Sequence, residues 1–404
     1  MNDPEIIPYG CQTIEEDDIE SVVEILRSTL ITTGPAVEQF EDKLRNYLGV
    51  KYAVVCSSGT AALHLACLAA GIGPGDDVIT SPLTFSASAN CSIFVNARPR
   101  FVDIEIDTGC MNADALEEYL SERKNNGSAR AVIPVHYSGL TCDIPGIYDI
   151  ARENDLVVIE DSCHALGAQY RHDGTWYMVG ACAHSDMSVF SFHPVKHITT
   201  GEGGAITTND ENIYKKLIKL RSHGMEKDHE HFKYPELAQD NTGNVNPWYY
   251  EIEEVGYNFR ITDFQCALGM HQLQKLETFL EKRRKIASVY TEAFSDLDHL
   301  ALQATFEDRN HAYHLFPVLI DYDAIGLTRG ELMLLLRDKG IGSQVHYIPV
   351  HYLGYYRKKF GYSPGDYPNA ERFYEKELSL PIFPKLTREQ QEHIIEEIQR
   401  VFSS

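Results

Sequence analysis

Between residues 52 and 208 the chain alternates short apolar, β-branched runs with helix-length stretches. The apolar runs predict strands over 52–56, 77–80, 100–104, 129–135, 155–161 and 186–192, and a further strand through 206–208. Helical patterns such as 61–70 and 147–154 lie between them. Strands that alternate with helices form crossover units, so we expect an α/β fold with a mainly parallel central sheet and helices on both faces.

The segment before this block has a helical pattern. Thr13 and Glu16 predict a capping box at a helix start, and the helix that follows has four residues on its apolar face: Ile19, Val22, Val23 and Leu26.

The segments after the block predict a loop, helices and a smaller α+β region. Residues 226–251 are polar, contain Pro235 and Pro247, and predict a long loop. Residues 262–294 predict a long helix or a pair of helices. After His311 we expect strands near 313–320 and 341–347 and a final helix from Thr387.

The charge and composition exclude several classes of protein. Among 404 residues, 59 acids against 36 lysines and arginines give a net charge of −23, which disfavours binding to nucleic acid or anionic lipid. No window reaches the roughly 18 apolar residues of a membrane span, and the start MNDPEIIPYG lacks the features of a signal peptide.

Nine cysteines without a CxxC pair predict reduced thiols in a cytoplasmic protein. The 17 histidines show no metal-ligand spacing, so we predict no metal site.

The segment CSSGTAAL (56–63) is the first that carries candidate chemistry. A strand ends there and an Ala/Leu helix begins, which leaves free backbone N–H groups that can bind an anion. Gly59 allows the backbone to approach closely, and the hydroxyls of Ser58 and Thr60 can bond to a phosphate. Taken alone, the segment favours a plain helix cap.

Two further segments carry a carboxylate and a lysine. The strand over 155–161 ends in Glu160 and Asp161, where ligands of open α/β sheets bind, and Asp161 can hold a proton on a cofactor ring nitrogen. The alternative is a surface acid. Lys196 lies between two strands near Gly203 and Gly204, where partial desolvation lowers a lysine pKa and provides a nucleophilic amine. The alternative is a solvated charge.

The combination is more specific than its parts. Pyridoxal phosphate needs an anion seat, a carboxylate at its pyridine nitrogen and a lysine for a Schiff base. Phe85, in PLTFSASAN (82–90), offers an aromatic face to such a ring or packs in the core.

The stretches SSGTAALHLA, EDSCHALGA, SFHPVKHITTGEGGAITTND, RSHGM and GYNFRITDFQCALG resemble the DegT/DnrJ/EryC1/StrS family of sugar-nucleotide aminotransferases. The resemblance covers residues 6–400 and implies the fold type I architecture of pyridoxal-phosphate-dependent transferases. It implies a large cofactor-binding domain with an N-terminal arm over 1–260, and a small C-terminal α+β domain with a connecting helix over 261–404. It also implies a homodimer with shared active sites.

The resemblance assigns roles to matching residues. Lys196 matches the lysine that forms the Schiff base with pyridoxal phosphate, Asp161 the carboxylate at the pyridine nitrogen, and His164 the residue near the phenolic oxygen. The other cofactor contacts are a phosphate-binding turn, a phosphate-binding serine, a stacking ring and an asparagine that reaches the neighbouring subunit's site: Gly59 with Thr60, Ser191, Phe85 and Asn258. Sugar-nucleotide contacts are implied at Tyr9, Thr29, Leu30, Ile31, Thr32, Gly59, Ser191, Asn258, Gln344, Val345, His346 and Tyr347.

The implied activity is transfer of an amino group from an amino acid, L-glutamate by resemblance, to C4 of a nucleotide-linked 4-keto-6-deoxy sugar. The wording around 188–200, 256–260 and 344–347 is most similar to family members of pseudaminic acid biosynthesis, which aminate UDP-4-keto-6-deoxy-N-acetyl-β-L-altrosamine. Alternatives are another UDP-, GDP- or TDP-linked keto sugar aminated at C4 or C3, and a catalytically silent regulator. Candidate cations for a diphosphate are Arg221, Arg260 and the run 282–285, although that run favours a solvated helix face.

Overall fold

A seven-stranded sheet forms the centre of the computed structural model, which describes residues 6–122 and 128–403. The strand order is β1 (Tyr52–Cys56), β9 (Gly204–Thr208), β8 (Met187–Ser191), β5 (Val157–Asp161), β4 (Ala129–Ile133), β2 (Asp77–Thr80) and β3 (Arg98–Phe101). Neighbouring strands are parallel except at β9, which is antiparallel to both β1 and β8. The predicted mainly parallel sheet is confirmed.

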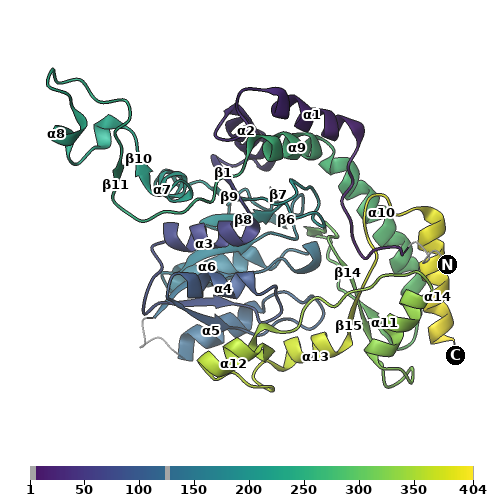
Figure 1. Cartoon of the computed structure of the whole chain (residues 1–404). Coiled ribbons are helices and arrows are strands. Elements are labelled where there is room, and N and C mark those ends of the chain that lie inside the picture. The colour runs from purple at the N-terminus through teal and green to yellow at the C-terminus, as the bar shows by residue number, and fades with distance from the viewer. Residues whose placement is uncertain (1–5, 123–127, 404) are drawn as a thin grey trace.

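Helices cover both faces of this sheet (Figure 1). Alternate strand residues enter two different cores, because successive side chains of a strand point to opposite faces. Val55, Val132 and Val158 pack with α2 (Pro35–Leu48), α5 (Ala113–Glu122), α6 (Ile144–Glu153) and α9 (Asp263–Gln274). Val54 and Ile159 pack with α3 (Gly59–Ala69), α4 (Ala87–Phe94) and α7 (Glu211–Arg221).

A smaller antiparallel sheet joins β12 (Leu300–Leu302), β14 (Phe316–Ile320) and β15 (Glu377–Leu380). It shares a core with α10 (Leu276–Phe294), α11 (Arg329–Asp338) and α14 (Arg388–Phe402), while α12 (Gly354–Phe360) and α13 (Pro368–Lys376) run below the large sheet in Figure 1. The predicted helix pair over 262–294 and the final helix are confirmed. The boundary at residue 260 stays a prediction, and positions 1–5 and 404 of the two predicted domains lie outside the described residues.

The segment 341–347 is not a strand, which corrects the prediction. Ile341 makes an isolated parallel bridge to Ile7, and Gln344 makes an isolated antiparallel bridge to Ser379. The segment bonds to a different partner at each end, so no continuous ladder forms. The residue pattern of 341–347 predicted a strand, but the segment lines a cavity and is not part of a sheet. The hairpin of β6 (Gln169–His172) and β7 (Thr175–Met178), which pairs with β13 (Arg309–Asn310), was also not predicted.

The first helix, α1 (Glu16–Arg27), is present but begins differently from the prediction. Glu15 is the N-cap and forms the capping box with Asp18. Thr13 is buried upstream and its hydroxyl has no partner among the described residues. Asp18 faces α9, where it accepts hydrogen bonds from Gln272 and Lys275 at 2.9 Å each. The predicted apolar face is only partly covered: 48% of Ile19 and 55% of Leu26 are exposed, and Val22 and Val23 are half-buried.

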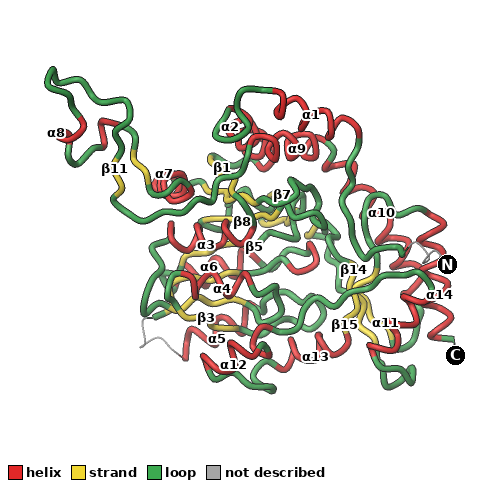
Figure 2. The backbone as a smooth tube through the Cα atoms, viewed as in Figure 1, coloured by secondary structure: helices red, strands yellow, loops and turns green. Residues whose placement is uncertain are grey.

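The polar segment predicted as a loop projects away from the body (Figures 1 and 2). We call residues 225–255 the arm. A short pairing of β10 (Met225–Glu226) with β11 (Glu251–Ile252) forms its base, and α8 (Pro235–Ala238) lies in its outer part. The rest is loop and turn apart from a single 3₁₀ turn at His229–His231, so the prediction missed these short elements.

All nine cysteines are free thiols. Among the described residues, no helix combines the length and the apolar character that crossing a bilayer requires.

Candidate active site

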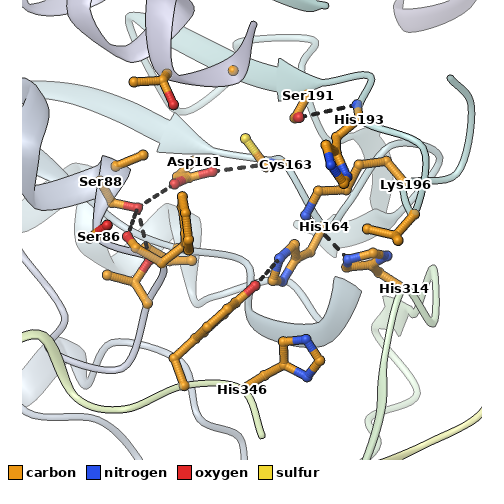
Figure 3. A pocket seen from close by; sticks show the side chains of 18 of the residues that line it. Ser86, Ser88, Asp161, Cys163, His164, Ser191, His193, Lys196, His314 and His346 are labelled. Atoms are coloured by element: carbon orange, nitrogen blue, oxygen red, sulfur yellow. Dashed lines mark hydrogen bonds between the residues drawn. The ribbon is translucent and has the colours of Figure 1, made fainter. Parts of the chain in front are cut away.

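A cavity of about 650 Å³ opens where strands β5 and β8 end and α3 begins (Figure 3). Segments far apart in the sequence line it, including Gly59, Phe85, Asp161, Lys196 and Tyr347. This position follows from the topology, because the carboxyl ends of neighbouring parallel strands meet at one edge of the sheet.

The N-terminus of α3 forms one wall of the cavity. Ser58 is the N-cap, and its Oγ accepts a hydrogen bond from the backbone N–H of Ala61 at 3.1 Å. A Cβ atom at Gly59 would lie 2.9 Å from Cβ of Ser191, the last residue of β8. Glycine is therefore required for the close approach of helix and strand, and free backbone N–H groups face a space that suits an anion.

Asp161, the last residue of β5, is buried and held at both oxygens. Ser88 at the start of α4 donates to Oδ2 at 2.6 Å, and the backbone N–H of Cys163 donates to Oδ1 at 3.2 Å (Figure 3). These two donors fix the direction of the carboxylate. Sequence reasoning missed Ser88, although it lies three residues after Phe85.

Lys196 places its amine among histidines. Its Nζ lies 3.2 Å from Nε2 of His314, which comes from the segment just before β14 (Figure 3). Burial lowers the pKa of Lys196 to about 8. Burial also lowers the pKa of His314 well below its ordinary value, with the charge of Lys196 as a second cause. The neutral His314 can therefore accept a hydrogen bond from the amine. Sequence reasoning missed His314 because its segment reads only as a strand.

His164 and Tyr347 close another side of the cavity. The Tyr347 hydroxyl and Nε2 of His164 lie 3.0 Å apart, and the rings of His164 and His314 have centroids 4.4 Å apart. Burial lowers the pKa of His164 and raises the pKa of Tyr347. The tyrosine is thus the donor and the histidine the acceptor. Phe85 stands opposite, 59% exposed, with its ring centroid 6.1 Å from that of Tyr347.

Most of the sequence-predicted site residues lie around this one cavity. Besides the residues above, its lining includes Thr60 and the predicted substrate contacts Tyr9 and 344–347. Asn258 does not line it: the residue is exposed and bridges to Ser222. The predicted contacts at 29–32 are also exposed and outside the lining, because this turn is bridged to Thr262 at the start of α9. These five positions lie outside the lining of their own chain's cavity, so their roles stay predictions, and Asn258 is the one predicted to reach the neighbouring subunit's site.

The candidate cations have other roles. Arg221 is paired with Glu41 at 2.5 Å and donates to the carbonyl of Val55. Arg283 is 1% exposed and donates to three backbone carbonyls, which corrects the predicted solvated helix face. Arg284 also donates to carbonyls. Arg260 makes no hydrogen bond or ion pair within the described chain, but it does not line the cavity.

The residues fit the cofactor that the resemblance implies. The helix N-terminus at Gly59 is a cradle that any Cβ would fill. The buried Nδ1 atoms of His164 and His314 have no hydrogen-bond partner among the described residues, and both residues line the cavity. A fixed carboxylate and a buried amine complete the set that pyridoxal phosphate requires.

Comparison with known proteins identifies relatives over nearly the whole chain. A model of the DegT/DnrJ/EryC1/StrS aminotransferase family matches residues 12–399. The chain is 41% identical to the uncharacterized protein MJ1066 of Methanocaldococcus jannaschii, over 96% of each chain. It is 39% identical to the spore coat polysaccharide biosynthesis protein SpsC of Bacillus subtilis, over 98% of this chain and 97% of that one. It is 36% identical to the UDP-4-amino-4,6-dideoxy-N-acetyl-β-L-altrosamine transaminase of Campylobacter jejuni, over 93% and 92%.

Solved structures show the same fold. The Helicobacter pylori aminotransferase PseC, involved in the biosynthesis of pseudoaminic acid, superimposes with a TM-score of 0.87 at 30% identity, over 98% of this chain and 99% of that one. A putative sugar aminotransferase of Streptococcus pneumoniae, solved in its pyridoxal phosphate form, gives 0.85 at 30% identity, over 98% and 99%. The expected fold type I architecture and cofactor are thereby confirmed. The chain belongs to the DegT/DnrJ/EryC1/StrS aminotransferase family and is a pyridoxal-phosphate-dependent sugar aminotransferase.

Proposed function

We propose that this protein transfers an amino group from L-glutamate to C4 of a nucleotide-linked 4-keto-6-deoxy sugar, UDP-4-keto-6-deoxy-N-acetyl-β-L-altrosamine. The observation that carries the proposal is the buried Lys196 amine in one cavity with Asp161 and the Gly59 cradle. The choice of sugar is supported by 36% identity to a transaminase named for the 4-amino product of that sugar.

Lys196 is the proton carrier in this proposal. When bound, pyridoxal phosphate supplies a pyridine ring that takes up the electron pair left on a substrate carbon. The Lys196 amine, with its pKa lowered to about 8, would take the proton from the amine-bearing carbon of the donor and, in the second half of the reaction, deliver a proton to C4 of the sugar. His314 holds the free amine by its Nε2 and keeps it inside the cavity.

The other residues bind and orient the cofactor. Asp161, fixed by Ser88 and Cys163, would hold the proton on the ring nitrogen. The N-terminus of α3 at Gly59 and Thr60, with Ser191, would hold the phosphate. Phe85 would cover the ring, and His164 would lie near its phenolic oxygen.

Replacing Lys196 tests the catalytic assignment. The Lys196→Arg variant keeps a long cation but stays protonated near neutral pH and cannot accept a proton, so turnover should fall by at least about 10³-fold. Circular dichroism should show an unchanged fold. Lys215→Arg, at an exposed position of α7, is the matched control and should retain full activity. Near-normal transamination by Lys196→Arg would refute the assignment.

A substrate panel tests the sugar. The purified protein is incubated with L-glutamate, pyridoxal phosphate and UDP-, GDP- and TDP-linked keto sugars, and mass spectrometry identifies the sugar that gains an amine. Amination of the UDP-linked altrosamine precursor supports the proposal. Exclusive amination of another sugar supports the alternative that the 39% identity to SpsC favours.

We also propose a cytoplasmic homodimer with shared active sites. The arm carries large side chains that single-chain packing leaves exposed, including 74% of Trp248 and 78% of Val255. Asn258, just beyond the arm, lies outside its own chain's cavity and is available to another. Mixing inactive Lys196→Arg with Asn258→Ala tests sharing, because a hybrid dimer has one intact site. Recovery of turnover on mixing is expected, and a mixture as inactive as its components would contradict the proposal.

A further inference from the structure

The strand β15 presents two polar side chains toward the cavity wall. Its sequence alternates Glu377, Leu378, Ser379 and Leu380, so the polar pair shares one face and the leucines enter the core of the smaller sheet. All four side chains are buried. A buried carboxyl two residues from a buried hydroxyl is costly unless both are hydrogen-bonded, and their common partner is His346.

His346 is held at three of its polar atoms. Its backbone N–H donates to Glu377 Oε2 at 2.8 Å, and its carbonyl accepts from the Tyr137 hydroxyl at 2.6 Å. Its ring Nδ1 lies 2.8 Å from Ser379 Oγ, which lies 2.5 Å from Glu377 Oε1. The ring nitrogen Nε2 has no hydrogen-bond partner in the described part of the chain, and His346 lines the cavity (Figure 3).

The Ser379 hydroxyl has one proton, so it can donate to only one of its two neighbours, and the protonation state of Glu377 sets which one. When Glu377 is ionised, Ser379 donates to it and accepts from Nδ1–H of His346, which leaves Nε2 as an acceptor. When Glu377 is protonated, it donates to Ser379, which donates to Nδ1, and Nε2 carries the ring proton. In each state all three groups are hydrogen-bonded. The hydrogen bonds from Glu377 through Ser379 to His346 therefore have two arrangements and no intermediate one.

We propose that Glu377 and Ser379 form a buried relay that sets which nitrogen of His346 carries the proton, and thereby whether Nε2 donates or accepts a hydrogen bond in the cavity. This proposal rests on the proposed function. With Nε2–H as donor, His346 binds an oxygen acceptor of the nucleotide keto sugar, such as its carbonyl or a phosphate oxygen. Glu377 and Ser379 are positioning residues, because they act only through His346.

The ionisation of Glu377, which changes the state of the relay, falls in a pH range that experiments can reach. Burial raises the pKa of Glu377 to about 8, and burial keeps His346 neutral by lowering its pKa to about 3. The ionisable groups that face the relay are Arg329 on α11, which opposes the rise, Lys196 and His164 across the cavity, and four tyrosines: Tyr9, Tyr137, Tyr322 and Tyr347. Each of these tyrosines has a raised pKa and stays neutral in this range. Near pH 8 two of these groups change charge, Glu377 within the relay and Lys196 across the cavity, and the Glu377→Gln variant separates their effects.

The ¹⁵N chemical shifts of the His346 ring report the proton directly and need neither cofactor nor turnover. In cofactor-free protein labelled with ¹⁵N-histidine, the proton should move from Nε2 below pH 8 to Nδ1 above it. The His346→Gln variant identifies the signals. In Glu377→Gln the amide N–H₂ can only donate to Ser379, so the proton should stay on Nε2 from pH 6 to 10. A wild-type ring whose tautomer does not change over that range would overturn the proposal.

Kinetics and a matched control complete the test. The wild-type KM for the keto sugar should rise about tenfold from pH 7 to pH 9, the equivalent of one net hydrogen bond, while Glu377→Gln should show no rise. Ser379→Ala should abolish the dependence and Ser379→Thr should restore it. Glu371→Gln removes the carboxylate from another buried pair, with His351 at 2.9 Å, and should leave the His346 tautomer unchanged. Because the NMR measurement is independent of transamination, inactivity on every sugar would refute the proposed function and not the relay.

Discussion

At the scale of single residues, the active site depends on charges placed where burial penalises them. Within the part of the chain that the structure describes, the Lys196 amine has a polar neighbour in His314 but no carboxylate within hydrogen-bond distance, so its cation is weakly stabilised. Asp161 has two donors and stays fixed. The same cavity therefore lowers the pKa of the amine and holds the carboxylate in one direction, an arrangement that suits proton transfer at a substrate carbon.

The Lys196 amine should titrate near pH 8 in the cofactor-free protein, because burial disfavours its cation. The folded value lies below the ordinary 10.5, so the amine becomes reactive at lower pH than surface lysines do. Competitive labelling with acetic anhydride, read by peptide mass spectrometry, measures this. The His314→Ala variant should admit water and raise the midpoint by about one unit. A wild-type midpoint near that of surface lysines would contradict the argument.

Gly59 should tolerate no side chain without loss of cofactor affinity. In Gly59→Ala the new Cβ would lie 2.9 Å from Cβ of Ser191 and push the helix away from β8. We expect the dissociation constant for pyridoxal phosphate to rise about tenfold, or about 1.4 kcal/mol, in an absorbance titration. Gly73→Ala, where a Cβ meets open space, is the control. Equal affinities of the two variants would argue against the cradle.

At the scale of elements, the antiparallel strand β9 positions the cavity wall. It lies between β1 and β8 and begins at Gly204, where a Cβ would be 2.6 Å from the Ser58 carbonyl carbon. The contact is to backbone and cannot relax by a rotamer change. The start of β9 thus packs directly against the N-cap of α3, so any movement of the strand requires a movement of the helix.

Substituting Gly204 should therefore destabilise the fold. Gly204→Ala should lower the free energy of unfolding by about 2 kcal/mol, the usual cost of overpacking. Gly330→Ala, within α11 and with open space around it, should raise it by about 0.5 to 1 kcal/mol, because alanine favours helix. Urea denaturation measures both. Opposite signs are expected, and a neutral Gly204→Ala would show that α3 and β9 can separate.

At the scale of the whole molecule, segments distant in sequence share the functional cavity. The N-terminal segment crosses to the smaller sheet, where Gly342 donates to the Ile7 carbonyl at 2.8 Å and Ile382 donates to the Tyr9 carbonyl at 3.1 Å. Arg283 of α10 joins the loop at Tyr313 and His314 to Ile382 by its three carbonyl contacts. The cavity therefore depends on how the large and small sheets are held together.

The free energy of unfolding should depend on pH in a way that the buried Glu377 determines. Its pKa in the folded protein is about 8, above the ordinary 4.5. Between these values the folded state retains a proton that the unfolded state has released, so the free energy of unfolding falls as pH rises. The slope from this group is at most about 1.4 kcal/mol per pH unit. Urea denaturation of wild type and Glu377→Gln at pH 5.5, 7 and 8.5 should show a flatter dependence in the variant. Parallel curves would contradict it.

The sequence by itself determined the strand and helix pattern of the large sheet and the residues that define its chemistry. Apolar runs between helices predict parallel strands because burial on both faces requires apolar side chains throughout. Asp161 was predicted because it ends a strand at the edge where ligands bind, and Lys196 because it lies between two strands near Gly203 and Gly204, where desolvation lowers a lysine pKa. Local sequence patterns were enough to predict these features, because the spacing of strands and helices is visible in the order of apolar and polar residues.

The tertiary structure alone decided which distant groups meet. Ser88 at Asp161, His314 at Lys196 and the Glu377–Ser379 pair at His346 are contacts between segments that no local pattern connects. The partly exposed apolar face of α1 and the buried Arg283 were mispredicted for the same reason. An amphipathic stripe does not specify whether its partner is the same chain, and a basic run does not show which carbonyls lie beside it. Burial sets the charge state of Lys196 and Glu377, and burial is a property of the assembled fold.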